Sequence, residues 1–243
     1  MEVDISITIP TRNRPDRLNQ TIISIIETAF DMKRIQIVIR IDNDDNTTIE
    51  YLSKLELINK YNFIIIKGEY TKNIVDLWNE CYSKCDGGRI MMCADDVIFR
   101  TSNWDSILIR VMPFPNSKPY FVWGNDKNQE HHLATLPIMS RYLIEKLGYF
   151  VPMGYRKEYC DTHLHDIMRK LEQIGYNIMT YLPDVIFEHM HPFVGKAQWD
   201  LTYESRRKFV EGDADRYKTY EKERNKEALE LYRKIQDDIN NNK

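Results

Sequence analysis

The strongest constraint on the fold is an alternation of strand-like and helix-like segments through the first hundred residues. Four short segments rich in β-branched or apolar residues have strand character, at 4–9, 35–41, 62–67 and 89–94. Amphipathic segments that predict helices separate them, from Pro15 to about 29, at 47–58 and at 73–85. This order predicts right-handed βαβ crossovers, a mostly parallel sheet and therefore an α/β fold.

The pattern is looser beyond residue 100. It predicts helices at 103–112 and 162–174, strands at 119–123, 133–138 and 184–189, and a charged helix from about 213. Two caps are expected at helix starts. Thr47 and Glu50 have the spacing of a capping box, and Asp161 precedes the helix at 162–174.

The predicted C-terminal helix carries a narrow apolar stripe. The stripe consists of Tyr217, Tyr220, Ala228, Leu231, Ile235 and Ile239. We expect it either to pack on the domain or to form the contact of a homodimer. No internal repeat and no flexible linker is evident, which favours one domain with a helical extension.

Composition excludes a disordered tail protein, a collagen-like chain and a disulfide scaffold. With 243 residues, 42% hydrophobic residues and a formal net charge of −3, the chain is typical of a globular protein. The near-neutral charge gives no global attraction to nucleic acid. No apolar run reaches the roughly 20 residues that span a bilayer, and no leader sequence is evident. The four cysteines form no CxxC pair, so we predict thiols and a cytoplasmic location, in a bacterium or an infected host cell.

Polar residues follow three of the predicted strands, where a parallel sheet of this kind binds its ligand. The first strand ends in Pro10, Thr11, Arg12 and Arg14 at a loop that enters a helix, and this loop predicts an anion or nucleotide contact. The second strand ends in a run that includes Asp42 and Asp44, which could accept hydrogen bonds from a ribose or a base. An ordinary turn explains that run equally well.

The fourth strand ends in Asp95 and Asp96. Adjacent carboxylates repel each other unless a cation is present, and Mg²⁺ or Mn²⁺ prefers such oxygen ligands. A solvated turn is the alternative for this pair alone. The three strand ends together favour a site for a nucleotide and a metal.

At these residues the chain resembles the family 2 glycosyltransferases of the GT-A fold. The matching segments include ISITIPTRNRPDRLNQTI, IVIRIDNDD, GGRIMMCADDVIF and VIFEHMHPFVGKAQWDLTY. The resemblance implies a Rossmann-like GT-A domain over 1–203, with a nucleotide-binding half at 1–100 and an acceptor half at 101–203. Residues 204–243 remain as the helical C-terminal extension.

The resemblance also implies roles for the strand-end residues. Thr11, Arg12 and Asp42 would contact the nucleotide of the donor. Asp95 and Asp96 would replace the DxD motif, with Asp95 mainly on the donor and Asp96 on Mn²⁺ or Mg²⁺. The sequence here is Ala-Asp-Asp rather than Asp-x-Asp, which blurs this division.

Two further segments acquire roles by the same resemblance. The family carries a Glu-Asp pair before a helix, and the Asp is the catalytic base. This chain has Cys160-Asp161 there, so Asp161 is the predicted base, with a helix cap as its other role. His189 is the favoured histidine ligand of the metal, His191 is the alternate, and Lys196 would reach the diphosphate.

Trp123 and Asp126 follow another predicted strand. An aromatic face and a carboxylate would suit a sugar ring in the donor or acceptor. A core tryptophan beside a turn is an equally good interpretation.

The predicted function is therefore metal-dependent, inverting transfer of a sugar from a nucleotide-diphosphate sugar, with a UDP-sugar favoured, to an acceptor hydroxyl. The acceptor is a glycan, a protein or, by the hint of a phage-like composition, a modified DNA base. A nucleotidyltransferase is an alternative, although the first loop lacks the glycines that this class uses for phosphate. A non-catalytic sugar- or nucleotide-binding module is the other alternative.

Overall fold

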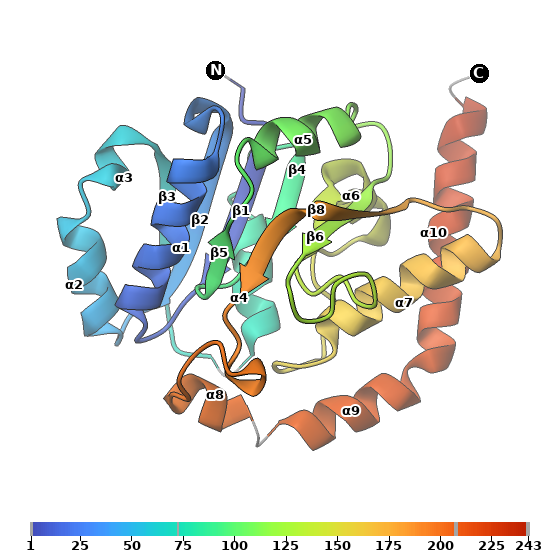
Figure 1. Ribbon diagram of the computed structural model, residues 1–243. Coiled ribbons are helices and arrows are strands. Elements are labelled where there is room, and N and C mark those ends of the chain that lie inside the picture. Colours follow the sequence, from blue (N-terminus) through green and yellow to red (C-terminus); the bar gives the residue numbers. More distant parts are fainter. Residues whose placement is uncertain (1, 72, 207–208, 242–243) are drawn as a thin grey trace.

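The computed structural model describes residues 2–71, 73–206 and 209–241 (Figure 1). Its strands are β1 (Ile5–Pro10), β2 (Ile35–Asp42), β3 (Asn62–Gly68), β4 (Arg89–Met92), β5 (Val97–Phe99), β6 (Phe121–Asn125), β7 (Ile138–Ser140) and β8 (Met179–His189). The α-helices are α1 (Pro15–Thr28), α2 (Asn46–Lys54), α3 (Leu57–Lys60), α4 (Ile74–Tyr82), α5 (Trp104–Val111), α6 (Arg141–Leu147), α7 (Cys160–Gln173), α8 (Leu201–Arg206), α9 (Val210–Thr219) and α10 (Glu221–Asn241). Two 3₁₀ turns, η1 (Met32–Arg34) and η2 (Pro192–Val194), complete the set.

The strands form one eight-stranded sheet in the order β3-β2-β1-β4-β7-β6-β8-β5. The pairs β1–β2, β1–β4, β2–β3 and β6–β8 are parallel, and the other neighbours are antiparallel. The mostly parallel sheet and the helical C-terminal segment confirm the predicted α/β fold class. In this order the carboxyl ends of β1 and β4 lie next to each other, and β5 and β8 close the other edge.

Helices cover both faces of the sheet. On one face α1, α2 and α5 bury their apolar sides, and Leu18, Ile22 and Leu108 are fully buried there. On the other face α4, α6 and α7 pack on the sheet, and α10 packs on α6 and α7. The all-buried pattern of β1 and β2 is what a strand with helices on both sides requires.

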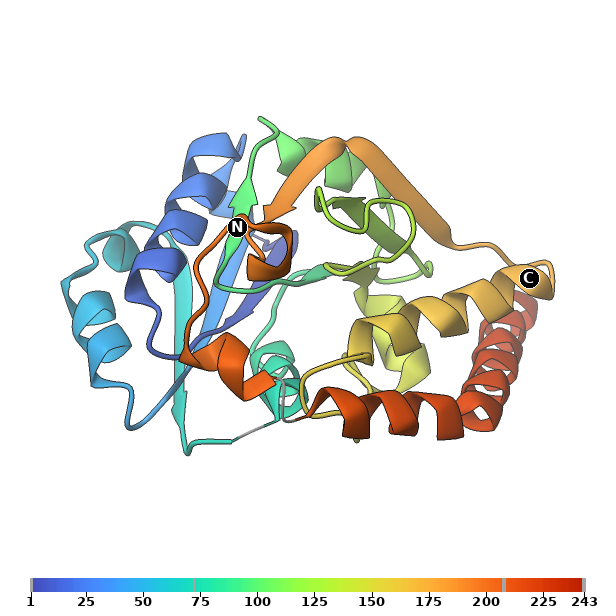
Figure 2. The ribbon, with the colours of Figure 1, turned by 60° about the horizontal axis from the view of Figure 1, so that its bottom comes forward.

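The C-terminal apolar stripe packs on the chain's own domain. Ala228, Leu231 and Ile235 are at most 2% exposed in the core shared with α7, whereas Ile239 is 40% exposed. In Figure 2, with the bottom of the molecule forward, α8 and α9 lie along the lower edge and lead to α10 at the right. A homodimer through this helix stays a prediction.

Several predicted boundaries are wrong. The helix expected at 47–58 divides into α2 and α3, and its N-cap is Asp45, whose side chain accepts the Thr48 N–H, rather than Thr47. The other oxygen of the Asp45 carboxylate accepts the N–H of Asn13, so the same side chain joins the start of α2 to the loop after β1. The final charged segment forms two helices, α9 and α10. The strand expected at 133–138 is misplaced, because β7 begins only at Ile138 and residues 133–137 form no strand. Strand β5 and helix α6 had no counterpart in the prediction.

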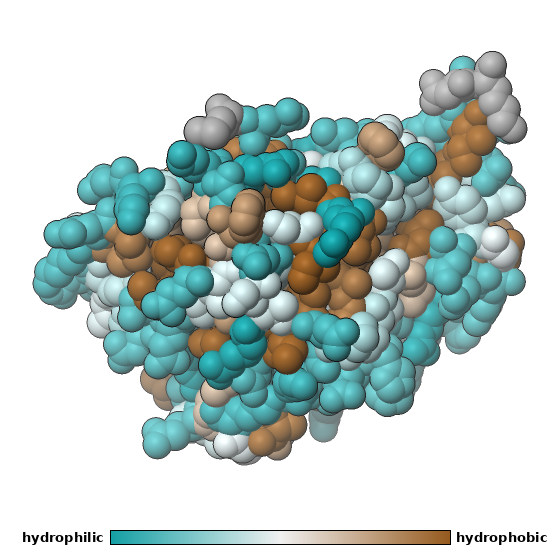
Figure 3. All heavy atoms as spheres, turned by 45° about the horizontal axis from the view of Figure 1, so that its top comes forward, coloured by the Kyte–Doolittle hydropathy of each residue, from teal (hydrophilic) through white to brown (hydrophobic). Residues whose placement is uncertain are grey.

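The surface is mainly hydrophilic, with separate hydrophobic patches on the face that Figure 3 shows. The more exposed large apolar side chains include Phe30, Leu201 and Phe193. Among the residues that the structure describes, no helix is both long and apolar enough to cross a membrane.

Candidate functional site

The loop after β1 places two arginines at the start of α1. Arg14 is the N-cap residue, Pro15 occupies the first turn, and Arg17 follows Arg14 by nearly one helical turn. Residues three apart in a helix share a face. Both guanidinium groups therefore extend toward the same place, beside the end of β4.

The turn between β4 and β5 supplies the two adjacent carboxylates. Asp95 accepts a hydrogen bond from the Thr11 hydroxyl at 2.7 Å and one from Arg14 at 3.0 Å. Both Asp95 and Asp96 are at most 4% exposed. The structure therefore brings together the residues that the sequence placed after the first and fourth strands.

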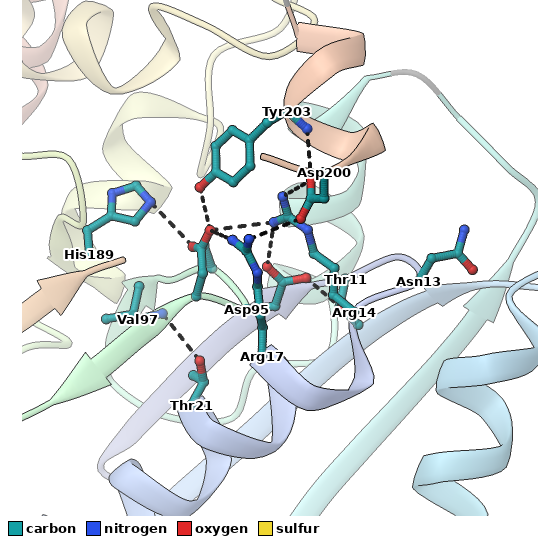
Figure 4. Close-up of polar contacts among 12 residues, drawn as sticks. Thr11, Asn13, Arg14, Arg17, Thr21, Asp95, Val97, His189, Asp200 and Tyr203 are labelled. Carbon is teal, nitrogen blue, oxygen red and sulfur yellow. Dashed lines mark hydrogen bonds and ion pairs between the residues drawn. The ribbon is translucent and has the colours of Figure 1, made fainter. Parts of the chain in front are cut away.

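Asp96 is the centre of the site. Its Oδ2 accepts a hydrogen bond from the Tyr203 hydroxyl, and Arg14 and Arg17 each approach that oxygen at 3.5 Å. His189 Nε2 lies 3.3 Å from the other oxygen, Oδ1. Strand β8 delivers the histidine, because its last residue pairs with Val97, next to Asp96. These side chains converge from separate elements (Figure 4).

Three residues of the site were not predicted. Arg17, Asp200 and Tyr203 complete the cluster, with Asp200 2.8 Å from Arg14 and 3.3 Å from Arg17. Asp200 also accepts the Tyr203 N–H at 3.1 Å, and the guanidinium of Arg14 lies over the Tyr203 ring at 4.5 Å. Arg17 had a signal in its helical spacing from Arg14, and Asp200 and Tyr203 lie in the family-like segment VIFEHMHPFVGKAQWDLTY, although the sequence analysis gave neither of them a role.

The charges of the cluster shift its carboxyl groups in opposite directions. Burial raises the pKa of Asp96, but His189, Arg14 and Tyr203 outweigh burial and hold that pKa below its usual range. Burial raises the pKa of Asp95, and the charge of Asp96 adds to that rise although Arg14 opposes it. Two close carboxylates with divergent pKa values are typical of a site built for a cation or an acid.

Within the described part of the chain, three buried polar atoms of this cluster, of both signs, make no hydrogen bond, although Arg17 Nη1 lies 3.5 Å from Asp96 Oδ2 and Asp96 Oδ1 lies 3.3 Å from His189 Nε2. Arg14 Nε, Arg17 Nη1 and Asp96 Oδ1 are buried and make no hydrogen bond among the described residues. Buried polar atoms normally have a hydrogen-bond partner, so these three atoms indicate a binding place for a ligand that carries both negative and positive charge. An anion would satisfy the guanidinium groups, and a cation would satisfy the Asp96 oxygen.

The residues around Asp96 fit a divalent metal. A carboxylate oxygen and an imidazole nitrogen are ligands that Mn²⁺ accepts. In the described ranges no group of three or more His, Cys, Asp or Glu side chains has a metal-binding arrangement. Asp96 and His189 would therefore supply only part of the coordination and leave the remainder to water or phosphate oxygens, as is usual for metal–nucleotide sites.

A second ionic cluster lies at the ends of β1 and β2. Arg12 donates to Asp42 at 2.8 Å and makes a bidentate contact with Asp44 at 2.5 and 2.8 Å. Tyr70 lies under the Arg12 guanidinium at 4.5 Å and is 52% exposed. Arg40, buried behind Asp42, donates to its other oxygen at 2.7 Å. The arrangement presents an exposed aromatic ring beside fixed acceptors.

Asp161 lies in the first turn of α7 and is half-buried. The prediction that it caps this helix is wrong, because α7 begins at Cys160 and its N-cap is Tyr159. Its Oδ1 accepts the N–H of Thr162 at 2.7 Å. The start of α7 lies on the same lower side of the molecule as α8 and the carboxyl ends of β1 and β8 (Figure 1).

The structure gives Lys196, Trp123 and Asp126 local partners. Lys196 pairs with Glu188 at 3.1 Å. Trp123 is 5% exposed and donates its Nε1–H to the Glu130 carbonyl. The assignment of Trp123 to a sugar ring stays a prediction.

The carboxylate of Asp126 is occupied by its own loop. One oxygen accepts three backbone N–H groups, from residues 128–130, and the other accepts the Thr135 hydroxyl at 2.8 Å. The backbone carbonyl of Asp126 accepts the N–H of His189 at 3.1 Å, so this loop also fixes the end of β8. Its assignment to a sugar hydroxyl likewise stays a prediction.

The fold resembles those of known nucleotide-sugar enzymes. The structure of S. aureus TarS 1–349 in complex with UDP superposes with a TM-score of 0.61 at 12% sequence identity, over 76% of this chain and 59% of TarS 1–349. The mannosyltransferase PcManGT from Pyrobaculum calidifontis, in complex with GDP-Man and Mn²⁺, gives a TM-score of 0.62 at 14% identity, over 81% of this chain and 59% of that chain. At these identities the likeness shows the fold, and the match spans about three fifths of the length of each of those chains.

The comparison of sequences gives the family. No curated protein matches this chain. The model of the family described as "Glycosyl transferase family 2" matches residues 6–163, which is more than half of the chain and contains most of β1, all of β2, Asp95, Asp96 and the start of α7. This match confirms the resemblance seen in the strand-end motifs, and the chain belongs to glycosyl transferase family 2.

Proposed function

We propose that this protein transfers a sugar, with inversion, from a nucleotide-diphosphate sugar to an acceptor hydroxyl, and that a UDP-sugar is the donor. The observation that carries the proposal is the Asp96 cluster, in which buried atoms of Arg14, Arg17 and Asp96 have no hydrogen-bond partner. A diphosphate would pair with the two guanidinium groups, and a divalent cation would pair with the Asp96 carboxylate. Family membership supports the chemistry, and the TarS structures with UDP and with UDP-GlcNAc support the choice of nucleotide.

The donor lies along the carboxyl ends of the first strands in this proposal. Arg12, Asp42 and Asp44 contact the nucleoside, with Pro10 and Thr11 forming the floor of the loop. Asp95 contacts the ribose or the sugar, and Arg14 neutralises the diphosphate, joined by Arg17. Lys196 reaches the diphosphate only by leaving Glu188, which it contacts at 3.1 Å.

Mn²⁺ or Mg²⁺ is the proposed cofactor, held by Asp96 and His189. When bound, the ion offsets the negative charge that develops on the departing diphosphate. The PcManGT structure, in complex with GDP-Man and Mn²⁺, supports this proposal. His191 is the alternate ligand; its ring contacts that of His189 at 5.2 Å and that of Tyr203 at 4.7 Å.

Asp161 is the proposed catalytic base. It would take the proton of the acceptor hydroxyl while that oxygen attacks the anomeric carbon from the face opposite the diphosphate. The place of Asp161 in the first turn of α7, on the side of the molecule where β1 and β8 end, supports this role. The proposed acceptor is a hydroxyl of a glycan, a protein or a modified DNA base.

Two matched substitutions test the proposal. We expect Asp96→Asn and Asp161→Asn each to reduce the release of UDP from a UDP-sugar to a small but measurable residual rate, measured with a panel of donors. Only Asp96→Asn should weaken the Mn²⁺-dependent binding of UDP in calorimetry, because Asp161 acts on the acceptor. Asp237→Asn, an exposed site on α10, serves as the control.

Three results would contradict it. If the Mn²⁺ dependence of UDP binding is unchanged in Asp96→Asn, the metal assignment is wrong. If Asp161→Asn keeps full turnover, another group is the base. Nucleotide binding without turnover of any donor would instead identify a non-catalytic binding module.

A further inference from the structure

A buried carboxylate in α9 holds the turn that leads into α7. Asp213 is 3% exposed, and its oxygens accept the backbone N–H groups of three consecutive residues, Arg156, Lys157 and Glu158, at 2.9 to 3.2 Å. Three successive amides aimed at one carboxylate fix the path of the backbone between them. Asp213 lies in the C-terminal extension, to which the sequence assigned no role beyond packing.

This turn sets the direction in which α7 starts. Directly after the three amides, Tyr159 adopts a left-handed conformation with φ of 63° and ψ of 0°, and α7 begins at Cys160. The Tyr159 carbonyl accepts the N–H of His163 at 2.8 Å. Asp161 therefore follows the last amide held by Asp213 by only three residues.

Two further contacts clamp the same turn. The Tyr159 ring stacks on Tyr217, which lies one helical turn beyond Asp213 on α9, with centroids 5.4 Å apart. On the other side the Arg156 carbonyl accepts the N–H of Ile74 at the start of α4. The turn is thus fixed between α4 and α9 and has little freedom to change the orientation of α7.

Helix α10 fastens α9 to α7 in turn. Arg224 is 3% exposed, lies over the Tyr217 ring at 3.8 Å, and donates to the Tyr217 carbonyl and to Asp166 on α7, both at 2.5 Å. One buried guanidinium therefore joins α9, α10 and α7. The three helices hold Asp213 in place against the turn.

We infer that Asp213 is a positioning residue for the transfer reaction: by holding residues 156–158 it sets the first turn of α7 and so the direction of the Asp161 carboxylate. The inference rests on the proposed function, in which Asp161 takes the proton of the acceptor. A base displaced by about 1 Å can lose roughly a hundredfold in rate without any loss of substrate binding. Asp213 touches no reacting group and acts only through Asp161.

The test compares Asp213→Asn with Asp215→Asn. Asp215 lies on the same helix and is 78% exposed, so its variant makes the same charge change without the buried contacts. The amide that Asp213→Asn introduces offers one accepting oxygen in place of two and should loosen the turn. We expect kcat for nucleotide release from the preferred UDP-sugar to fall by about ten- to a hundredfold, with the donor KM within about twofold of the parent. Asp215→Asn should match the parent in both constants.

A double variant separates positioning from a general structural effect. If Asp213 acts through Asp161, adding Asp213→Asn to Asp161→Asn should cause no further loss of the residual rate. Losses that multiply in the double variant, a kcat unchanged in Asp213→Asn, or a donor KM that rises with the fall in kcat would each overturn the inference. If Asp161→Asn itself keeps full turnover, the proposed base fails first, and this inference fails with it.

Discussion

Two buried carboxylates of this molecule differ in the groups that surround them. The side chains of Arg14, Arg17, Tyr203 and His189 contact Asp96. Among the residues described, its Oδ1 accepts no hydrogen bond and has only the ion-pair contact with His189. Asp213 is met by consecutive backbone N–H groups. Side chains can turn away and admit a ligand, whereas backbone amides can leave only if the chain refolds. Burial of an acid therefore says little about its role until its partners are known.

The largest effect on stability should come from the backbone-held acid. Asp213→Ala removes the acceptor of three N–H groups that face a buried carboxylate, and we expect a loss of about 2 to 3 kcal/mol in the free energy of unfolding. Urea denaturation measures it, with Asp215→Ala as the control, expected within about 0.5 kcal/mol of the parent. The loss should be the same with and without UDP and Mn²⁺. A denaturation midpoint equal to that of the control would remove the contrast between the two acids.

A smaller effect, and one that depends on ligand, is expected for Tyr203→Phe. The variant loses one hydrogen bond to an ionised group, for which we expect about 1.5 kcal/mol, the lower end of the usual range. Because the hydroxyl and a cation compete for the same carboxylate, the difference from the parent should shrink when UDP and Mn²⁺ are saturating. Thermal unfolding with and without these ligands measures this. An undiminished difference would show that the Tyr203 contact persists in the bound state and is as fixed as those of Asp213.

The smallest effect should be a gain. Burial raises the pKa of Asp95 in the folded protein. The ionised carboxylate therefore lowers the free energy of unfolding at neutral pH. Below the ordinary carboxyl pKa this cost disappears, because Asp95 is then protonated in both the folded and the unfolded protein. The amide of Asp95→Asn can still meet Thr11 and Arg14, so we expect a slightly higher unfolding midpoint at pH 7 and a loss of transfer. The gain should fade as pH falls through the raised pKa. A variant that is less stable than the parent at pH 7 would show that the site stabilises the fold.

The first half of the fold could be predicted because β1, β2 and β4 are buried on both faces, the edge strand β3 is rich in isoleucine, and the helices are amphipathic. β2, for example, forms from the run IQIVIRI, and such a short run of β-branched residues between helix-like segments is typical of a buried strand in a parallel sheet. β5 is a strand of three residues, too short for any period to show. It exists because its residues pair with the end of β8, almost ninety positions later in the chain.

The site was predicted as far as its residues lie at strand ends. Thr11, Arg14, Asp95, Asp96 and His189 converge as the strand order requires. Asp200 and Tyr203 lie outside any strand, and nothing local to them indicates that they meet Arg14 and Asp96. The cap of α7 was misassigned for a related reason: a carboxylate from α9 holds the preceding turn, and a helix-start pattern carries no trace of such a contact.

The contact between Arg14 and Asp200 joins residues 186 positions apart. During synthesis the parallel sheet up to β4 can assemble while Asp200 is still untranslated. The ion cluster around Asp96, in contrast, must wait until Asp200 and Tyr203 have also been made. A chain that stops short of that point leaves two arginines and two carboxylates without their last partner. The order of synthesis therefore places the completion of this centre after the assembly of the parallel strands that carry its first residues.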